Sequence, residues 1–440
     1  MRVRGWVYFA AWLLVITLGA PASLEASPKI KYWQLDNGAR VYFVEARELP
    51  MMQLRVAFDA AGARDPKDKS GLAKLTNGML NEGAGDLSTD EIAIRLEELG
   101  AELGTSSGRD IATVDLRTLT DPVLMEPALD VFVKVLSAPT FLQRNFERER
   151  ARAVVAVAQE NQSPGSVAQK RFMRTIYGNH PYAPDPTGDE ESLKRITRED
   201  LVEHYQRYYV GRNALMVIVG DLSEAEAQRV ARKTVGTLPA GAAAPSLPMP
   251  APLASTQLNE IEFPSSQSHV LIGQPGITRS DPDYFPLYVG NYIFGGGGLV
   301  SRLSDEVREK RGLSYSVYSD VIPLRVPGLF LMSLQTRNAQ RREANTVVRS
   351  TLDDFRRDGP TAEELQAAKK NITGGFPLRL DSNRKITEQV VTIAFYGLPL
   401  DYLEEFPRRV EAVTAAQIRD AFQRRIDPQR MATVIVGGKP

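Results

Sequence analysis

The chain has 440 residues, of which 43% are hydrophobic and 25% charged, a composition that excludes a disordered or fibrous protein and allows two or three domains. Lys plus Arg and Asp plus Glu number 54 each, so no net electrostatic field favours binding to nucleic acid or to an anionic membrane surface. The chain has no cysteine, which excludes thiol chemistry, disulfides and cysteine-ligated metal.

The N-terminus, residues 1–26, has the pattern of an export signal. Arg2 and Arg4 precede an apolar run over residues 6–19, and a cut after Ala22 or Ala26 fits the small residues that follow. The run is shorter than the roughly 20 residues that span a bilayer, which favours a cleaved signal over an uncleaved anchor. We therefore expect a periplasmic protein without stable membrane insertion.

The next segment, residues 28–238, mixes strands with helices. Residues 54–58 and 112–118 alternate apolar and polar side chains, the pattern of half-buried strands. Between them we predict one helix with Leu72, Leu75, Met79 and Leu80 on one face. A second helix opens with the capping box from Ser88 to Glu91, places Ile92, Leu96 and Leu99 on one stripe, and ends at Gly100. Further capping boxes at Ser223 to Glu226 and Thr361 to Glu364 predict other helix starts.

Residues 239–255 are rich in Pro and Ala and have little that could pack, which predicts a linker between an N-terminal domain, 28–238, and a C-terminal domain, 256–440. The segments that end these two domains align without a gap, at a constant offset that pairs Thr197 with Thr414 and Gly220 with Gly437. Seven of the 25 positions from Thr197 to Asp221 are identical to their counterparts. The match predicts an internal duplication. We expect an α+β fold of two duplicated domains, each a mostly antiparallel sheet packed with helices.

The first of the predicted helices, which begins Gly71-Leu-Ala-Lys-Leu-Thr-Asn-Gly-Met-Leu80, resembles the signature helix of the pitrilysin/insulinase family of zinc peptidases, whose members include the mitochondrial processing peptidases. In that family the helix carries HxxEH, whose two histidines share one face and bind zinc while the glutamate acts on the zinc-bound water. Here Lys74 and Gly78 stand at the histidine positions and Asn77 at the glutamate position. Protonated lysine has no lone pair and glycine has no side chain, so we expect this chain to bind no metal through these positions.

The family's third ligand is a glutamate on a later helix, and residues 150–162 resemble that helix. Its matching position falls at about Val157 or Ala158, and Glu160 should face elsewhere because two residues turn a helix through roughly 200°. The three histidines of the chain are scattered singly along it, and we interpret each as a structural or surface residue rather than as a ligand: His180, His204 and His269.

The C-terminal half resembles the family's second signature over Gly295-Gly-Gly-Gly-Leu-Val-Ser-Arg-Leu303 and Arg308-Glu-Lys-Arg-Gly-Leu-Ser-Tyr315-Ser-Val-Tyr318. The resemblance implies that Arg308 and Tyr315 contact bound substrate and the carbonyl under attack. We expect Arg308 near the end of a helix built on Leu303 and Val307, where it offers a planar charged fork, and Tyr315 at the start of a strand, where it offers a phenol donor. Packing and solvation are the alternative roles for this pair.

The glycine run lacks the following Gly-Lys-Ser/Thr of a phosphate-binding loop. We expect it to be a loop in which Gly295, Gly296 and Gly297 let the backbone pass close to a neighbouring domain or to a bound peptide. Family members add an extended substrate to a sheet edge, and the matching segment here is residues 102–108, with Thr105 and Ser106. Its Ser and Gly content suits a plain loop equally well.

The resemblance implies a division of labour between two chains. Our leading hypothesis is a non-catalytic subunit of a heterodimeric periplasmic zinc metallopeptidase that is inactive alone, supplies Arg308 and Tyr315, and pairs with a homologous subunit that holds the zinc. Peptides or unfolded proteins would be the substrates. The alternatives are a peptide-binding or scaffold protein with no role in hydrolysis, and a self-sufficient peptidase with a different metal site.

Overall fold

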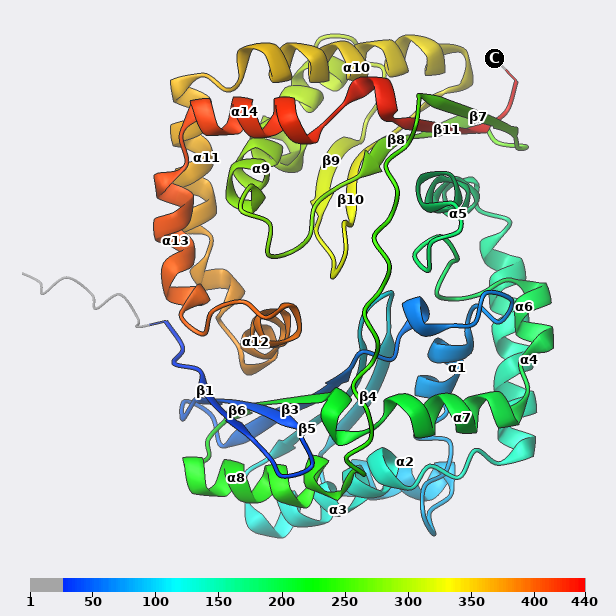
Figure 1. Ribbon diagram of the computed structural model, residues 1–440, viewed down its shortest axis with the longest axis vertical. Helices are drawn as coiled ribbons and strands as arrows, with labels where there is room; N and C mark the ends of the chain where they lie inside the picture. Colours follow the sequence, from blue (N-terminus) through cyan, green and yellow to red (C-terminus); the bar gives the residue numbers. More distant parts are fainter. Residues whose placement is uncertain (1–26, 440) are drawn as a thin grey trace, which may run out of the picture.

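The computed structural model describes residues 27–439 and arranges them as two halves, each a sheet with packed helices (Figure 1). The expected export signal, residues 1–26, lies outside the described residues. Within those residues, no helix is both long and apolar enough to cross a membrane.

The N-terminal half contains a six-stranded sheet in the order β1-β2-β6-β3-β5-β4. Every neighbouring pair is antiparallel except β2 and β6, which are parallel. The predicted strands at 54–58 and 112–118 are confirmed, and they pair directly as β3 and β5. The strands are β1 (Lys31–Gln34), β2 (Arg40–Glu45), β3 (Met51–Phe58), β4 (Glu102–Ser107), β5 (Ala112–Leu119) and β6 (Ala214–Gly220).

Most helices of the same half begin where a side chain satisfies a free backbone N–H group. The capping boxes at Ser88 and Ser223 are confirmed, each with its partner glutamate three residues later. The helices are α1 (Leu72–Gly78), α2 (Thr89–Glu98), α3 (Pro122–Ser137), α4 (Gln143–Glu160), α5 (Pro164–Tyr177), α6 (Glu190–Arg195), α7 (Arg198–Tyr208) and α8 (Glu224–Lys233).

The C-terminal half contains a five-stranded sheet in the order β7-β11-β8-β10-β9, again antiparallel except for the pair β7 and β11. The strands are β7 (Gln257–Glu262), β8 (Gln267–Pro275), β9 (Val317–Ile322), β10 (Leu329–Arg337) and β11 (Ala432–Gly437). The helices are α9 (Tyr284–Asn291), α10 (Arg341–Asp358), α11 (Ala362–Gly374), α12 (Asn383–Tyr396), α13 (Tyr402–Ala412) and α14 (Ala415–Arg425). The α+β class with mostly antiparallel sheets is thereby confirmed.

The internal duplication extends well beyond the aligned segments. The order β2-β6-β3-β5-β4 in the first sheet corresponds strand by strand to β7-β11-β8-β10-β9 in the second, with the same parallel pair. The first residues of β2 and β7, Arg40 and Gln257, are separated by the same offset as Thr197 and Thr414, and so are the first residues of α7 and α14. The offset found from sequence therefore relates the two domains along most of their length, whereas β1 and α8 have no counterpart among the described elements.

One helix of each half packs against the sheet of the other half. Helix α5, from the N-terminal half, packs on β8 and β11 of the second sheet, and α12, from the C-terminal half, packs on β3 and β6 of the first (Figure 1). Phe172 of α5 is fully buried in the cluster that contains Leu271 and Val434, and Val390 of α12 is fully buried with Leu215 and Val217. Full burial of a side chain of this size stabilises a fold by about 1.5–3 kcal/mol. The exchange therefore makes the two halves depend on each other.

The segment 239–255 crosses from one half to the other without helix or strand (Figure 1). The expectation that it has little to pack was wrong. The carbonyl oxygen of Pro239 accepts a hydrogen bond from the backbone of Gly211 at 2.8 Å, and that of Pro248 bonds to His180 at 2.8 Å. Leu253 is 7% exposed in the same cluster as α5. A proline-rich segment without periodic structure can thus be fixed by its carbonyl groups, which proline retains.

The turns of two hairpins meet where the halves join. Asp110, between β4 and β5, accepts hydrogen bonds from the Tyr182 hydroxyl at 2.5 Å, from the backbone N–H of Arg325 at 3.0 Å and from the Tyr396 hydroxyl at 3.3 Å. Arg325 lies between β9 and β10 and stacks on Phe395 of α12 at 4.1 Å. Burial, followed by the charge of Asp110, raises the pKa of Tyr182, so this phenol remains a donor. Side chains from both halves therefore satisfy one buried carboxylate.

Candidate functional site

Helix α1 carries the three positions that correspond to the zinc motif. The N-terminus of α1 is fixed by Asp65, whose carboxylate accepts hydrogen bonds from the backbone N–H groups of Gly71 at 2.8 Å and Ala73 at 2.7 Å. Gly71 has φ 97°, a conformation that favours glycine. Leu72 and Leu75 face the core, whereas Lys74 and Gly78 are exposed. Residues four apart share a helix face, so the two degenerate ligand positions lie one turn apart on the open side of α1.

The side chain of Asp65 is partly buried, and its desolvation raises the pKa of the carboxyl to about 7, partly offset by the two backbone donors. The folded chain therefore holds a proton that the unfolded chain releases. This contribution to stability is present at low pH and is lost as the pH rises through about 7.

Asn77, at the glutamate position, is a structural residue. Its side-chain amide donates hydrogen bonds to the carbonyl oxygens of Ser106 at 2.9 Å and Thr113 at 3.1 Å, and its side-chain oxygen accepts one from the Tyr209 hydroxyl at 2.9 Å. It is 1% exposed. A glutamate here would place acceptor oxygens against two carbonyl acceptors. Asn77 thus ties α1 to β4 and β5 instead of facing a reactant.

The residues present do not fit a zinc ion at the family position. Lys74 and Gly78 offer no lone pair. Val157 and Ala158, the two candidates for the third-ligand position on α4, are apolar, and Val157 is 2% exposed in the core. Glu160 forms an ion pair with the ammonium of Lys170 at 3.1 Å. Across residues 27–439, no group of three or more His, Asp or Glu side chains could hold a metal ion.

The three histidines lie in separate surroundings. His180 contacts the carbonyl of Pro248 and accepts from the backbone N–H of Tyr182, His204 contacts the carbonyl oxygen of Ala60 at 3.0 Å, and His269 lies beside Gln335. The structural interpretation of His180 and His204 is confirmed.

His204 provides a pH prediction. Burial lowers the pKa of its imidazole to about 4, so the folded state keeps it neutral while the unfolded state takes up a proton below pH 6.5. Between pH 6.5 and pH 4 the free energy of unfolding should fall by up to about 3 kcal/mol from this residue alone. We expect His204→Gln, which keeps a donor for Ala60, to lack this part of the fall in urea titrations. Asp65 contributes equally to both proteins, so its opposing contribution cancels when the unfolding free energies of variant and wild type are subtracted. Parallel curves of unfolding free energy against pH would contradict the assignment to His204.

Thr105 and Ser106 lie on the strand β4. Residues 102–107 are therefore a sheet edge and not the plain loop that their composition also allowed. β4 is the edge of its sheet, paired only with β5. A groove of about 500 Å³ runs beside it, between β4 and α2. Its lining residues come from α2, β4 and the chain just after α1: Asn81, Thr89, Ile92, Ala93, Leu96, Glu97, Ala101, Glu102 and Leu103. An unpaired strand edge next to a partly apolar groove can accept an extended peptide through backbone hydrogen bonds.

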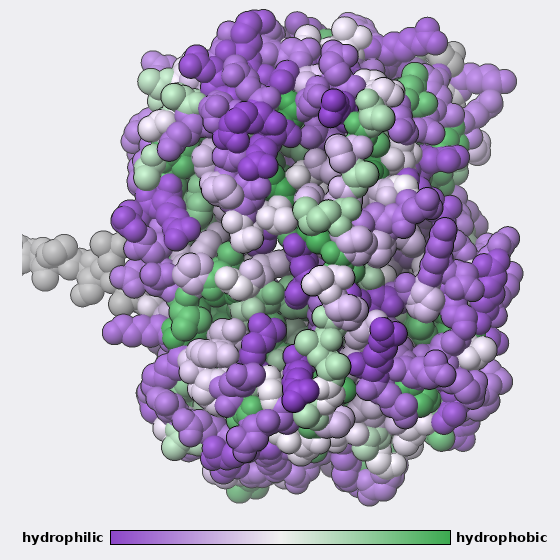
Figure 2. Space-filling view, viewed as in Figure 1, coloured by the Kyte–Doolittle hydropathy of each residue, from purple (hydrophilic) through white to green (hydrophobic). Residues whose placement is uncertain are grey.

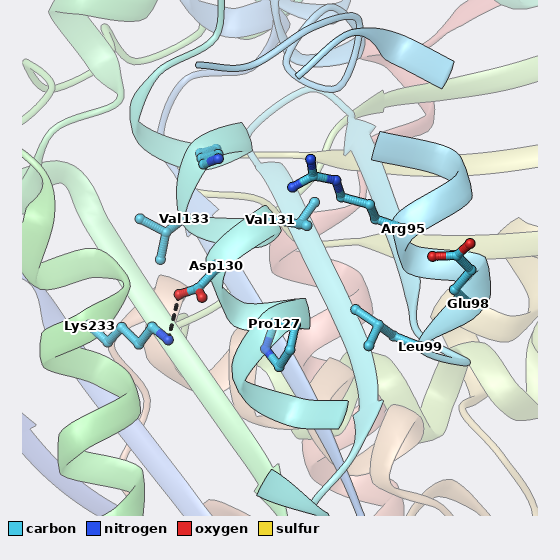
Figure 3. Close-up of a pocket in the computed structure, with 9 residues that line it drawn as sticks. Arg95, Glu98, Leu99, Pro127, Asp130, Val131, Val133 and Lys233 are labelled. Carbon is cyan, nitrogen blue, oxygen red and sulfur yellow. Dashed lines mark ion pairs between the residues drawn. The ribbon is translucent and has the colours of Figure 1, made fainter. Parts of the chain in front are cut away.

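A second hollow, of about 520 Å³, lies in the outer helical layer between α2 and α3 (Figure 3). It contains none of the site residues predicted from sequence. Lys233 closes one side through ion pairs with Asp130 at 2.6 Å and Glu126 at 2.8 Å. Arg229 also pairs with Glu126, so these two cations and two carboxylates balance, and we assign this hollow no chemistry. Figure 2 shows that apolar side chains gather in the middle of the visible face, between the halves, whereas the outer ends are hydrophilic.

The glycine run is helical, and its prediction as a loop was wrong. Residues Tyr292–Gly296 continue α9 as a π-helical turn (η4), and Gly298–Val300 form a short 3-10 turn (η5). Gly295 is buried against the strand β9 of its own domain, so its close approach is not to a peptide or a neighbouring domain. A Cβ there would lie 2.7 Å from the backbone nitrogen of Ser319 and 2.7 Å from Leu303. Gly296 and Gly298 are exposed.

Gly295→Ala should therefore lower the free energy of unfolding by about 1–3 kcal/mol, because the added methyl group meets the backbone of β9. Gly374→Ala is the matched control: it lies at the end of α11 with no atom within 4 Å of the added Cβ, and should be neutral or slightly stabilising. Chemical denaturation measures both, and equal stabilities would contradict the packing account.

Arg308 and Tyr315 are brought together. Arg308 lies in the last turn of the π-helix Ser304–Glu309 (η6), on a segment whose Leu303 and Val307 are fully buried, as predicted. Its guanidinium stacks on the Tyr315 ring at 4.5 Å. Tyr315 precedes rather than opens the strand, because β9 begins at Val317, and it is 83% exposed. Among the described residues, no hydrogen bond or ion pair joins this pair to Lys74, Asn77 or Ser106.

Comparisons with known proteins agree with this geometry. Residues 41–187 match the family described as insulinase (peptidase family M16), and residues 195–372 match the peptidase M16 inactive domain. A solved peptidase M16 inactive domain from Pseudomonas fluorescens is 37% identical, with a TM-score of 0.90 over 93% of this chain and 98% of that one. The "non-peptidase homolog YmxG" of Helicobacter pylori is 24% identical over 97% of this chain and 98% of its own. A probable mitochondrial-processing peptidase subunit beta from Schizosaccharomyces pombe is 24% identical over 83% of this chain and 82% of its own.

Proposed function

Because this chain belongs to the insulinase family of peptidases, family M16, and is an inactive member of it, we propose that it is the non-catalytic subunit of a heterodimeric periplasmic zinc metallopeptidase. In this proposal a homologous partner subunit holds the zinc, and this chain supplies Arg308 and Tyr315 to the partner's active site. Peptides or unfolded proteins are the substrates. One related protein is named as a subunit of a processing peptidase, which supports pairing of this kind.

The observation that carries the proposal is the exposed Arg308–Tyr315 stack. A tyrosine kept for packing would be buried, but Tyr315 is 83% exposed and is held by a guanidinium at 4.5 Å. A preorganised phenol can donate to an oxyanion that forms at a carbonyl, and an arginine fork can bind a neighbouring carbonyl or carboxylate. The zinc-motif positions of the same chain offer no metal ligand. The pair therefore suits a reaction centre on another chain.

Association and metal content test the proposal. We expect the chain to co-purify with an exported HxxEH protein of the same organism as a one-to-one complex, with zinc bound to the partner alone. Stoichiometric zinc on this chain purified by itself would contradict the assignment. The periplasmic location rests on the sequence pattern of residues 1–26, and we expect the N-terminus of the mature chain to begin after Ala22 or Ala26.

The second candidate function is peptide binding or scaffolding without a role in hydrolysis. The open edge of β4 with its groove favours it, since neither feature needs a metal. Substitution of Arg308 or Tyr315 separates the two candidates. Under the scaffold function, neither substitution changes the peptidase activity of an assembled complex.

A further inference from the structure

The open edge of β4 has opposite charges at its two ends. From this arrangement we propose that the chain selects extended peptides by charge: Lys74 binds a peptide carboxylate at one end of the edge, and Glu97 binds a peptide cation at the other. The inference rests on peptide binding at the β4 edge, the feature that favours the second candidate function, and adds the class of peptide that is bound.

The positions of Lys74 and of the groove follow from the direction in which α1 runs along β4. The amide of Asn77 bonds to Ser106, near the end of the strand, whereas Asn81 lines the groove together with Glu102 and Leu103, at its start. Lys74 lies about one turn before Asn77, so it lies beyond Ser106, toward Gly108. The backbone contact between Gly62 and Gly108 at 3.1 Å, in the segment that leads to α1, agrees with this direction. Lys74 and the groove therefore lie at opposite ends of the edge.

The ammonium of Lys74 is available to a ligand. The side chain is exposed, and its ammonium forms no ion pair or hydrogen bond with any residue between 27 and 439. One turn later, Gly78 has no atom within 4 Å of where a Cβ would lie, so no side chain covers this face of α1. A free cation beside open space at the strand edge suits a carboxylate, from either an acidic side chain or a peptide C-terminus.

The end of the β4 edge beside the groove is acidic. Glu102 is already paired with Arg117, whereas Glu97 has no ion-pair partner in the described part of the chain. Between these acids the groove is lined by Ile92, Leu96 and Leu103. A basic side chain next to an aliphatic one complements this lining. The six residues of β4 span about 20 Å, which sets the separation between the peptide's cation and its carboxylate.

Fluorescence anisotropy with the full chain and labelled peptides tests the proposal. The probe is an extended peptide of about eight residues with Lys-Leu at one end and Glu at the other, its C-terminus amidated. We expect Glu→Gln in the probe to weaken binding about fivefold, and Lys74→Met to weaken the Glu probe equally while leaving the Gln probe unaffected. Glu97→Gln should act in the same way on the Lys end. A Gln probe with a free C-terminus distinguishes an α-carboxylate from an acidic side chain as the preferred group.

Lys370→Met is the matched control, since Lys370 is an exposed lysine on α11 of the other half. It should leave every affinity unchanged. Equal affinity for charged and neutral probes, or equal effects of Lys74→Met and Lys370→Met, would overturn the charge selection and leave peptide binding intact. No binding of any probe would contradict peptide binding at β4 as well.

Discussion

Tyr315→Phe should lower kcat/KM of the assembled peptidase by about 100-fold and leave assembly intact. The substitution removes one hydroxyl from an 83% exposed side chain, so it disturbs neither the fold nor the stack with Arg308. Loss of a single preorganised donor to an oxyanion typically costs 10²–10³ in rate. Arg308→Ala removes the charged fork and the support of the ring, so we expect it to raise KM in addition to lowering kcat.

Two neighbours provide matched controls for these substitutions. Tyr318→Phe makes the same chemical change three residues later, on β9, at a side chain that is 41% exposed. Arg311→Ala removes a guanidinium that is ion-paired with Glu306 at 2.6 Å rather than stacked on a ring. Both should leave kcat/KM within about twofold of wild type. Unchanged activity in Tyr315→Phe and Arg308→Ala complexes would refute the assigned roles and favour the scaffold function.

Phe172→Ala should destabilise the whole chain by about 3–5 kcal/mol. The side chain belongs to the N-terminal half, but it packs in a cluster that includes strands of the C-terminal sheet. Phe172 is fully buried, and its ring lies 3.0 Å from where a Cβ on Gly273 would be placed. The surrounding strands cannot close the cavity that alanine would leave. Because α5 and α12 are exchanged between the halves, we expect one cooperative unfolding transition instead of two.

Trp33 makes this prediction measurable. It is the only tryptophan among residues 27–439 and lies on β1 of the N-terminal half, so its fluorescence reports on that half while circular dichroism reports on both. In Phe172→Ala the two signals should shift together. Arg171→Ala, an exposed neighbour on α5, should shift neither. A variant in which circular dichroism falls before the Trp33 signal would contradict the interdependence of the halves.

The sequence predicted helices and strands of the fold, but not the exchange of α5 and α12 between the halves. Periodicity and capping boxes located α2, α8, α11, β3 and β5, and the repeat that pairs Thr197 with Thr414 turned out to relate two whole sheets. The apolar face of α5 predicts that this helix is buried. The hydrophobic effect is non-directional, so nothing in the pattern selects the sheet of the other half as the surface against which α5 packs. The packing of residues 239–255 was missed because it relies on backbone carbonyl groups and on two leucines among many prolines.

The candidate site was only partly predictable for a similar reason. The family resemblance placed Lys74 and Gly78 four residues apart on one face of α1, and the structure shows that both are exposed. The capping role of Asp65 was missed because it lies six residues before Gly71, outside the usual capping positions. Asn77 was placed at a lost catalytic position, but only its three hydrogen bonds reveal what it does instead. The glycine run was expected to be a loop because glycine disfavours helices, yet at Gly295 contact with β9 leaves no room for a side chain.

Peptide cleavage by each chain alone and by the two together tests the central claim most directly. The assay uses this chain, an exported HxxEH protein that co-purifies with it, and one quenched fluorescent peptide. We expect activity only in the mixture, because this chain offers no zinc ligand at the motif positions and, under the proposed function, the partner needs Arg308 and Tyr315. Cleavage by this chain alone, or undiminished cleavage by the partner without it, would contradict the division of labour.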